Sequence, residues 1–139
     1  MRSPDAVRNA LALTPASTAW ERTVDITTIG RRSGRPHRIE TWLYRAGDRN
    51  YLSGMPGPRS WLANLSVEPR FTLHLKHGIA ADLDATARIV TDEDERRRVF
   101  TELVADLNQP GNPARIRQPT TVEAWMAGSP LVEIRFDPW

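Results

Sequence analysis

The alternation of apolar and polar residues along this chain predicts short β-strands joined by tight turns. Strand-like alternation is found in these stretches: 21–29, 36–45, 51–53, 71–77, 79–90 and 131–136. In the second stretch Ile39 and Leu43 fall on one face and Glu40 and Tyr44 on the other, as a period of two residues requires. Strands that follow one another through short turns pair as antiparallel hairpins. The pattern therefore predicts a small antiparallel barrel with peripheral helices, an α+β fold that is mainly β.

Helices are predicted at the edges of this sheet. Helical spacing and helix boundary signals are found in residues 4–13, in residues 59–66, in the stretch that ends at residue 107 and in residues 120–127. The first helix begins with Ser3 as its cap and Pro4 at its first position, where proline is favoured. Thr91 and Asp94 are expected to form a capping box before the third helix.

Length and composition predict one domain over residues 1–139, with residues 1–20 as an N-terminal helix and linker. The chain has no cysteine, which excludes disulfides, thiolate catalysis and thiolate metal ligands. No apolar run approaches the roughly 18 residues of a membrane span, so we expect no integral membrane association and a cytoplasmic protein. The formal net charge is +2, and Lys76 is the one lysine among 19 basic residues. This arginine bias is typical of a GC-rich, actinobacterial type of genome.

One segment departs from the even mixture of charges found elsewhere. Residues 28–38 hold four arginines, one histidine and two glycines but no acid, and they lie between two predicted strands. Arginine binds phosphate and carboxylate through a bidentate fork, so a hairpin tip of this composition suits a polyanion. The alternative is an ordinary solvated turn. Because acids accompany the basic residues elsewhere, we do not expect nucleic-acid binding.

The stretch from Thr27 to Pro36, TTIGRRSGRP, resembles the corresponding turn of the deazaflavin-dependent nitroreductase family. Further pieces follow in the family's order: a Gly47-Asp48 turn, a Ser53-Gly54 loop, and a helix with Trp61 and Asn64. The resemblance covers about residues 25–90. It implies a split β-barrel related to flavin-binding barrels. It also implies binding of coenzyme F420, a deazaflavin with a phosphate and an oligoglutamate tail.

The resemblance implies these cofactor-binding residues: Arg31, Arg32, Ser33, Arg35, His37, Arg38, Ser53, Gly54, Met55, Arg59, Trp61 and Asn64. Two departures from the family pattern bear on this set. His37 stands where the family often has arginine, and prolines interrupt the loop after Gly54, where Arg59 is expected to supply the missing cation. Trp42, Tyr44 and Trp125 are expected on the substrate side, although this chain lacks the C-terminal tyrosines that the family often has there.

The implied function is an oxidoreductase that transfers a hydride from the reduced deazaflavin to an electron-poor small molecule, such as an enone, quinone or nitro compound. The cofactor carries this chemistry, so no catalytic side chain is named. No metal site is expected, because His74 and His77 are three residues apart in a predicted strand and would face opposite sides. The alternatives are an FMN-dependent barrel oxidoreductase and a non-catalytic haem- or lipid-binding barrel. A homodimer is compatible with all three functions.

Overall fold

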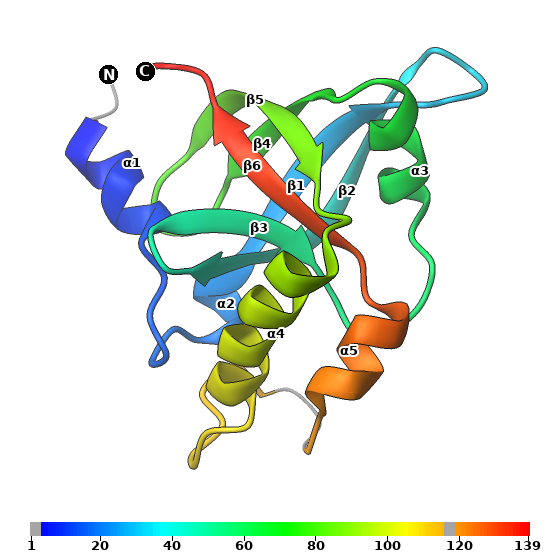
Figure 1. Cartoon of the computed structure of the whole chain (residues 1–139). Coiled ribbons are helices and arrows are strands. Elements are labelled where there is room, and N and C mark those ends of the chain that lie inside the picture. Colours follow the sequence, from blue (N-terminus) through cyan, green and yellow to red (C-terminus); the bar gives the residue numbers. More distant parts are fainter. Residues whose placement is uncertain (1–3, 116–118) are drawn as a thin grey trace.

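The computed structural model describes residues 4–115 and 119–139. Its strands form a closed antiparallel barrel in the order β1-β2-β3-β6-β5-β4 (Figure 1). The strands are β1 (Thr23–Ile29), β2 (Pro36–Ala46), β3 (Arg49–Ser53), β4 (Arg70–Leu75), β5 (Ala81–Ile89) and β6 (Leu131–Phe136). The predicted barrel is therefore confirmed, and each predicted stretch contains one strand. The predicted fifth strand begins at Ala81 rather than at residue 79, because Gly78 lies in a turn with a φ of +80°.

The helices are α1 (Pro4–Leu11), α2 (Ala19–Arg22), α3 (Ser60–Val67), α4 (Glu93–Leu107) and α5 (Val122–Gly128). Helix α2 was not expected, and it delays the first strand to Thr23. Its origin is a capping box: the Thr18 hydroxyl accepts a hydrogen bond from the Glu21 amide, and the Glu21 carboxylate accepts one from the Thr18 amide. The expected cap of the first helix, Ser3, lies outside the described residues.

The start of α4 differs from the prediction by one residue. Asp92 is the N-cap, and its carboxylate accepts a hydrogen bond of 2.9 Å from the backbone amide of Glu95. The expected pairing of Thr91 with Asp94 is therefore wrong. Asp92 caps better because its carboxylate is charged and also opposes the positive end of the helix dipole.

Buried side chains gather on both faces of the sheet. Inside the barrel, residues such as Ile26, Leu43 and Leu73 form one apolar cluster. On the outer face, Tyr44 of β2 packs in a second cluster together with Phe100 of α4. Figure 1 shows α4 and α5 lying together below the barrel, where they cover this outer face. Full burial of one such large side chain stabilises the fold by about 1.5–3 kcal/mol.

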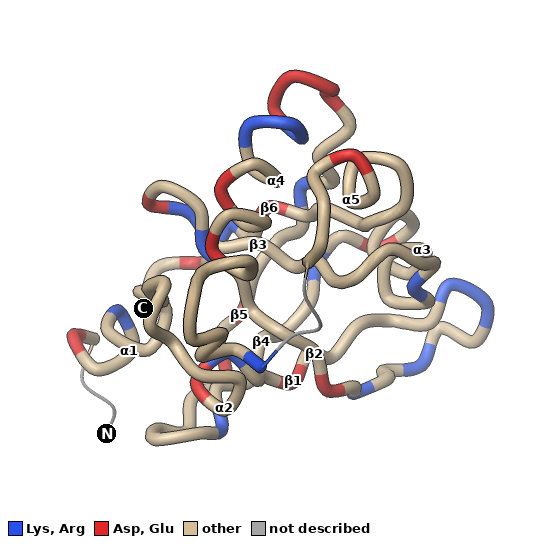
Figure 2. The backbone as a smooth tube through the Cα atoms, turned by 90° about the horizontal axis from the view of Figure 1, so that it is seen from below, with Lys and Arg blue, Asp and Glu red and all other residues tan. Residues whose placement is uncertain are grey.

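The hairpin formed by β1 and β2 extends beyond the barrel. Residues 36–40 of β2 are exposed and pair with β1, whereas β3 pairs only with residues 43–46. The turn of this hairpin lies beside α3 at one end of the molecule (Figure 1). Figure 2 shows Lys and Arg positions, with no acid among them, along the hairpin tip. The architecture thus brings the arginine-rich turn and α3 together, away from the covered face of the sheet.

His74 and His77 have different surroundings in the structure. His77 lies beyond the end of β4, and its ring centroid is 4.5 Å from that of Trp20. His74 lies within β4, with Nε2 2.7 Å from the Thr27 hydroxyl and Nδ1 2.7 Å from an Asp82 oxygen. Within residues 4–115 and 119–139, no group of three or more His, Cys, Asp or Glu residues is placed to hold a metal ion. In the same part of the chain, no helix has both the length and the apolarity to cross a membrane.

Candidate functional site

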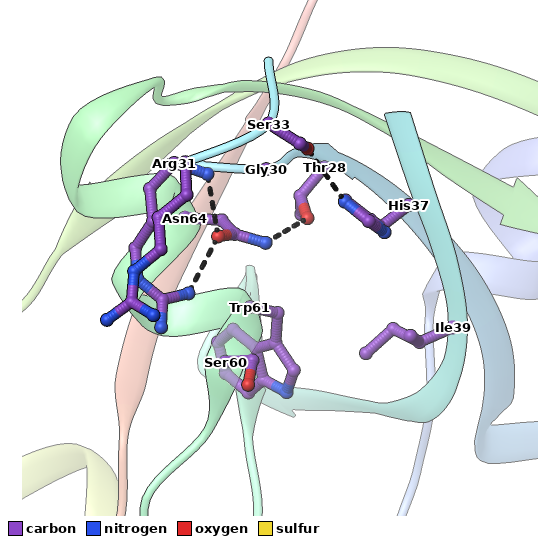
Figure 3. Close-up of a pocket in the computed structure, with 10 residues that line it drawn as sticks. Thr28, Gly30, Arg31, Ser33, His37, Ile39, Ser60, Trp61 and Asn64 are labelled. Carbon is purple, nitrogen blue, oxygen red and sulfur yellow. Dashed lines mark hydrogen bonds between the residues drawn. The ribbon is translucent and has the colours of Figure 1, made fainter. Parts of the chain in front are cut away.

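A cavity of about 500 Å³ lies between the hairpin tip and α3 (Figure 3). It is lined by Thr28, Gly30, Arg31, Arg32, Ser33, His37, Ile39, Ser60, Trp61 and Asn64. The cavity is thus built from the end of β1, the turn, the start of β2 and the first half of α3. Six of the cofactor-binding residues expected from the sequence line this cavity: Arg31, Arg32, Ser33, His37, Trp61 and Asn64.

Backbone hydrogen bonds close the turn. The Gly30 amide donates to the Arg35 carbonyl at 2.8 Å, and the Gly34 amide donates to the Gly30 carbonyl at 2.9 Å. Gly34 has a φ of +70°, a conformation that favours glycine. At Gly30 a Cβ atom would lie only 2.6 Å from both His37 Nε2 and Ser33 Oγ. Glycine at position 30 therefore allows the Ser33 and His37 side chains to meet over the turn, 3.2 Å apart.

Asn64 fastens the turn to α3. It is 7% exposed, and its Oδ1 accepts hydrogen bonds from the backbone amide of Arg31 at 3.1 Å and from Arg31 Nη1 at 3.0 Å. Its Nδ2 donates to the Thr28 hydroxyl at 3.1 Å (Figure 3). These bonds fix both the backbone and the guanidinium of Arg31. Asn64 thus acts by positioning Arg31.

Two arginines of the tip have no acidic partner. Arg32 and Arg35 are exposed, and no carboxylate in the described part of the chain forms an ion pair with either of them. Arg38 differs, since its Nε donates to Asp25 at 3.0 Å. Burial alone would raise the pKa of Asp25, but hydrogen bonds from Lys76 and Arg38 hold it below its usual range. Arg38 is therefore committed to this ion pair, and it does not line the cavity.

The remaining wall of the cavity is apolar. Trp61 is 4% exposed and packs in the core of the barrel, while Ile39 is 38% exposed at the rim. Ser60 lies beside Trp61 at the start of α3 (Figure 3). Sequence reasoning missed Thr28, Ile39 and Ser60. Thr28 carried a usable signal, because it occupies an inward-facing position of β1, where a polar side chain requires a partner.

Arg59 does not supply a free cation at the following loop. Its guanidinium folds back and donates to the carbonyls of Gly57 at 2.9 Å, Met55 at 2.8 Å and Pro58 at 3.2 Å. It also occupies the space beside Gly54, where a Cβ atom would lie 2.7 Å from Arg59 Nη2. Arg59 therefore holds together a loop whose prolines cannot donate backbone hydrogen bonds.

The other expected residues of this loop also lie outside the cavity. The Ser53 hydroxyl is buried and donates to the Pro130 carbonyl at 2.6 Å, which anchors the loop next to β6. Met55 is 37% exposed. The structure thus separates the residues 53–59 from the cavity at the hairpin tip, whose walls they do not form.

Two of the three expected substrate-side residues, Tyr44 and Trp125, are core residues. Trp125 is fully buried, with its ring centroid 5.8 Å from that of Phe100 and 6.1 Å from that of Tyr44. Its Nε1 donates to the Thr120 hydroxyl at 2.5 Å. Burial raises the pKa of Tyr44, so its hydroxyl stays protonated. Helices α4 and α5 cover this face of the sheet, so Tyr44 and Trp125 are buried there and Trp42 is partly buried beside them; a substrate-side role for these residues stays a prediction.

The family model described as F420H(2)-dependent quinone reductase matches residues 8–119. The chain belongs to this family. The matched segment includes every residue that lines the cavity. As a member of the F420H(2)-dependent quinone reductase family, the protein is an oxidoreductase that uses reduced coenzyme F420. The resemblance to deazaflavin-dependent enzymes is thereby confirmed.

Solved structures confirm the split-barrel fold. A conserved hypothetical protein from Mycobacterium tuberculosis is similar with a TM-score of 0.66 and 19% identity, over 99% of this chain and 82% of that one. An FAD-binding protein from Mesorhizobium loti has a TM-score of 0.61 and 15% identity, over 99% of this chain and 91% of that one. The haem storage protein HutZ from Vibrio cholerae has a TM-score of 0.61 and 14% identity, over 100% of this chain and 93% of that one.

Proposed function

We propose that the cavity at the hairpin tip is the deazaflavin site of this reductase and that its acceptor is a quinone. The observation that carries the proposal is the pair of guanidinium groups without acidic partners: Arg32 lines a cavity with an apolar wall, and Arg35 lies in the same turn but outside the lining. Guanidinium groups would hold the phosphate and the tail carboxylates. Trp61 and Ile39 offer apolar surface to an aromatic ring.

The residues present fit such a cofactor. Three arginines at the tip provide more positive charge than a single phosphate would neutralise. The bonds from Asn64 hold Arg31 in one orientation before any ligand arrives, which lowers the entropy lost on binding. Among the described residues that line the cavity, none is an acid that would repel a polyanion.

When bound, the reduced deazaflavin supplies the hydride that reduces the acceptor. The side chains of the protein would bind and orient the cofactor and exclude water from it. Trp61 and Ile39 keep one wall apolar, and the Arg31–Asn64–Thr28 network fixes the opposite wall. Reduction of a quinone by a hydride also requires a proton, which water can supply.

A side-by-side titration tests the cofactor. We expect purified protein to bind oxidised coenzyme F420 more tightly than FMN or haem, because FMN offers one phosphate and haem requires an axial ligand. Equal or tighter binding of FMN would contradict the proposed site. Haem belongs in the comparison because the fold is shared with a haem storage protein.

A turnover assay tests the acceptor class. Reduced coenzyme F420 would be offered with a soluble naphthoquinone, an enone or a nitroaromatic compound, and its oxidation would be followed by absorbance. We expect the highest kcat/KM with the quinone. If the enone or the nitro compound is reduced and the quinone is not, the quinone proposal is wrong while the cofactor site stands.

A further inference from the structure

A second cavity, of about 390 Å³, lies on the other side of α3. It is an open cavity bordered by the loop at Gly57 and Pro58, the end of β5, Arg96 in the first turn of α4 and the end of α5. Its walls are mostly apolar and include Leu62 and Leu131. It shares no lining residue with the cavity at the hairpin tip. A ligand bound here would therefore not fill the cavity at the hairpin tip.

One charged side chain, Arg96, lines this cavity. Its Nη1 donates to the Val90 carbonyl at 3.3 Å, and its Nη2 donates to the carbonyls of Met126 at 3.2 Å and Ser129 at 3.0 Å. Its Cζ lies 5.0 Å from the centroid of the Phe100 ring. These bonds use three of the five N–H groups of the guanidinium, so two donors are left for a ligand.

The charge of Arg96 is not neutralised by the protein. Arg88 and Arg97, which lie nearby in the sequence, each form ion pairs with glutamates. For Arg96, by contrast, no carboxylate lies within ion-pair distance in residues 4–115 and 119–139. Burial without a neighbouring acid lowers the pKa of Arg96, although arginine stays charged in proteins. An anion in the cavity would supply the missing negative charge.

A second polar group in the same wall also lacks a partner. Ser129 is 4% exposed and lines the cavity, and its hydroxyl forms no hydrogen bond with any described residue. A buried hydroxyl without a partner is unfavourable, and unsatisfied groups of this kind are uncommon in folded proteins. Ser129 also provides one of the carbonyls that bind Arg96, so the residue with the free hydroxyl contacts the guanidinium through its backbone.

We propose that this cavity binds a small carboxylate with an apolar body. The Arg96 guanidinium and the Ser129 hydroxyl bind the carboxylate, and the side chains of Leu62 and Leu131 contact the apolar part. An oligoglutamate tail is a poorer match, because its polar residues gain nothing from apolar walls. The inference does not depend on the cofactor proposed above.

Calorimetric titration with 2-naphthoate tests the proposal, and 2-naphthylmethanol is the neutral control of the same shape. We expect the carboxylate to bind at least about tenfold more tightly than the alcohol, as a charge-assisted hydrogen bond implies. The Ser129→Ala variant removes a hydroxyl that bonds to nothing, so its melting temperature should be unchanged or higher while naphthoate affinity falls about threefold or more. In the Arg96→Gln variant the affinity for naphthoate should fall at least about tenfold.

Arg97→Gln is the matched control, because Arg97 follows Arg96 in the same helix but is exposed and paired with Glu123. This variant should bind naphthoate as the wild type does. A purely structural role of Arg96, tying α5 to the end of β5, predicts no binding of naphthoate or equal affinity for acid and alcohol, and either result overturns the proposal. Displacement of naphthoate by oxidised deazaflavin would also overturn it. Unchanged deazaflavin affinity in Ser129→Ala separates the two sites.

Discussion

Asn64 is the residue on which the geometry of the hairpin tip depends. Its buried amide satisfies the Arg31 backbone, the Arg31 guanidinium and the Thr28 hydroxyl at once. The Asn64→Ala variant removes this partner from all three groups. We expect a loss of about 1–3 kcal/mol in the free energy of unfolding and at least about tenfold weaker deazaflavin binding.

Asn50 provides the matched control for this substitution. It is also a buried asparagine, and its Nδ2 donates to the Leu11 carbonyl at 2.8 Å, far in sequence from the tip. In the Asn50→Ala variant the free energy of unfolding, measured in urea, should fall by a comparable amount. Its affinity for the deazaflavin should equal that of the wild type. If both variants lose affinity equally, Asn64 acts through general stability, and its positioning role is refuted.

Arg59 gives a second test at this scale. Since its guanidinium bonds to three carbonyls of its own loop, Arg59→Ala should loosen the loop and lower the melting temperature. The effect of Arg59→Ala on binding affinity should be the same for the full cofactor and for a truncated deazaflavin without phosphate and tail. Arg32→Ala should instead weaken binding of the full cofactor only. A selective effect of Arg59→Ala on the full cofactor would restore it as a phosphate ligand.

At the scale of elements, α4 is tied to the sheet through charged groups. Arg88 of β5 forms ion pairs with Glu95 of α4 and with Glu133 of β6, and all three side chains are at least partly buried. Hydrogen bonds from Arg88 hold the pKa of Glu95 below its usual value. The resulting stability is present above the pKa of glutamate in the unfolded chain and is lost as the pH falls through the lower pKa of the folded state.

This linkage predicts a pH dependence. Between about pH 7 and pH 3 the free energy of unfolding should fall, and the fall should be smaller in Glu95→Gln, which has no proton to gain at this position. Urea unfolding at several pH values measures both. Glu93→Gln, an exposed position on the same helical turn, is the control for the loss of one carboxylate from α4. An unchanged pH dependence in Glu95→Gln would contradict the role assigned to this ion pair.

The elements were largely predictable and the contacts of their side chains were not. Alternation located every strand because a strand with one buried face must alternate. The burial of Tyr44 could not be predicted, because alternation identifies the two faces of β2 but does not show which face α4 will cover. Arg59 was misread for a related reason: composition shows a cation beside a loop, but whether it bonds to carbonyls or to a ligand depends on the loop's path.

At the scale of the whole molecule, the barrel separates two kinds of surface. One end carries the arginine-rich tip beside α3, and another side, below the barrel in Figure 1, is covered by α4 and α5. The two cavities lie on either side of α3, one with unpaired exposed arginines and one with Arg96 in its wall. A single short helix thus positions both candidate binding sites, and it does so at the end of the hairpin that projects from the barrel.

The most direct test of the central claim is a titration of oxidised coenzyme F420 against the wild type, the double variant Arg32→Ala/Arg35→Ala, and the control Arg97→Ala/Arg98→Ala, which removes the same charge from α4. The wild type should bind coenzyme F420 more weakly as the salt concentration rises from about 50 mM to about 300 mM, because exposed charges are screened. The tip variant should fold normally, bind at least about tenfold more weakly and lose most of that salt dependence. The control should match the wild type. A folded tip variant with wild-type affinity would contradict the assignment of the hairpin tip as the cofactor's anion site.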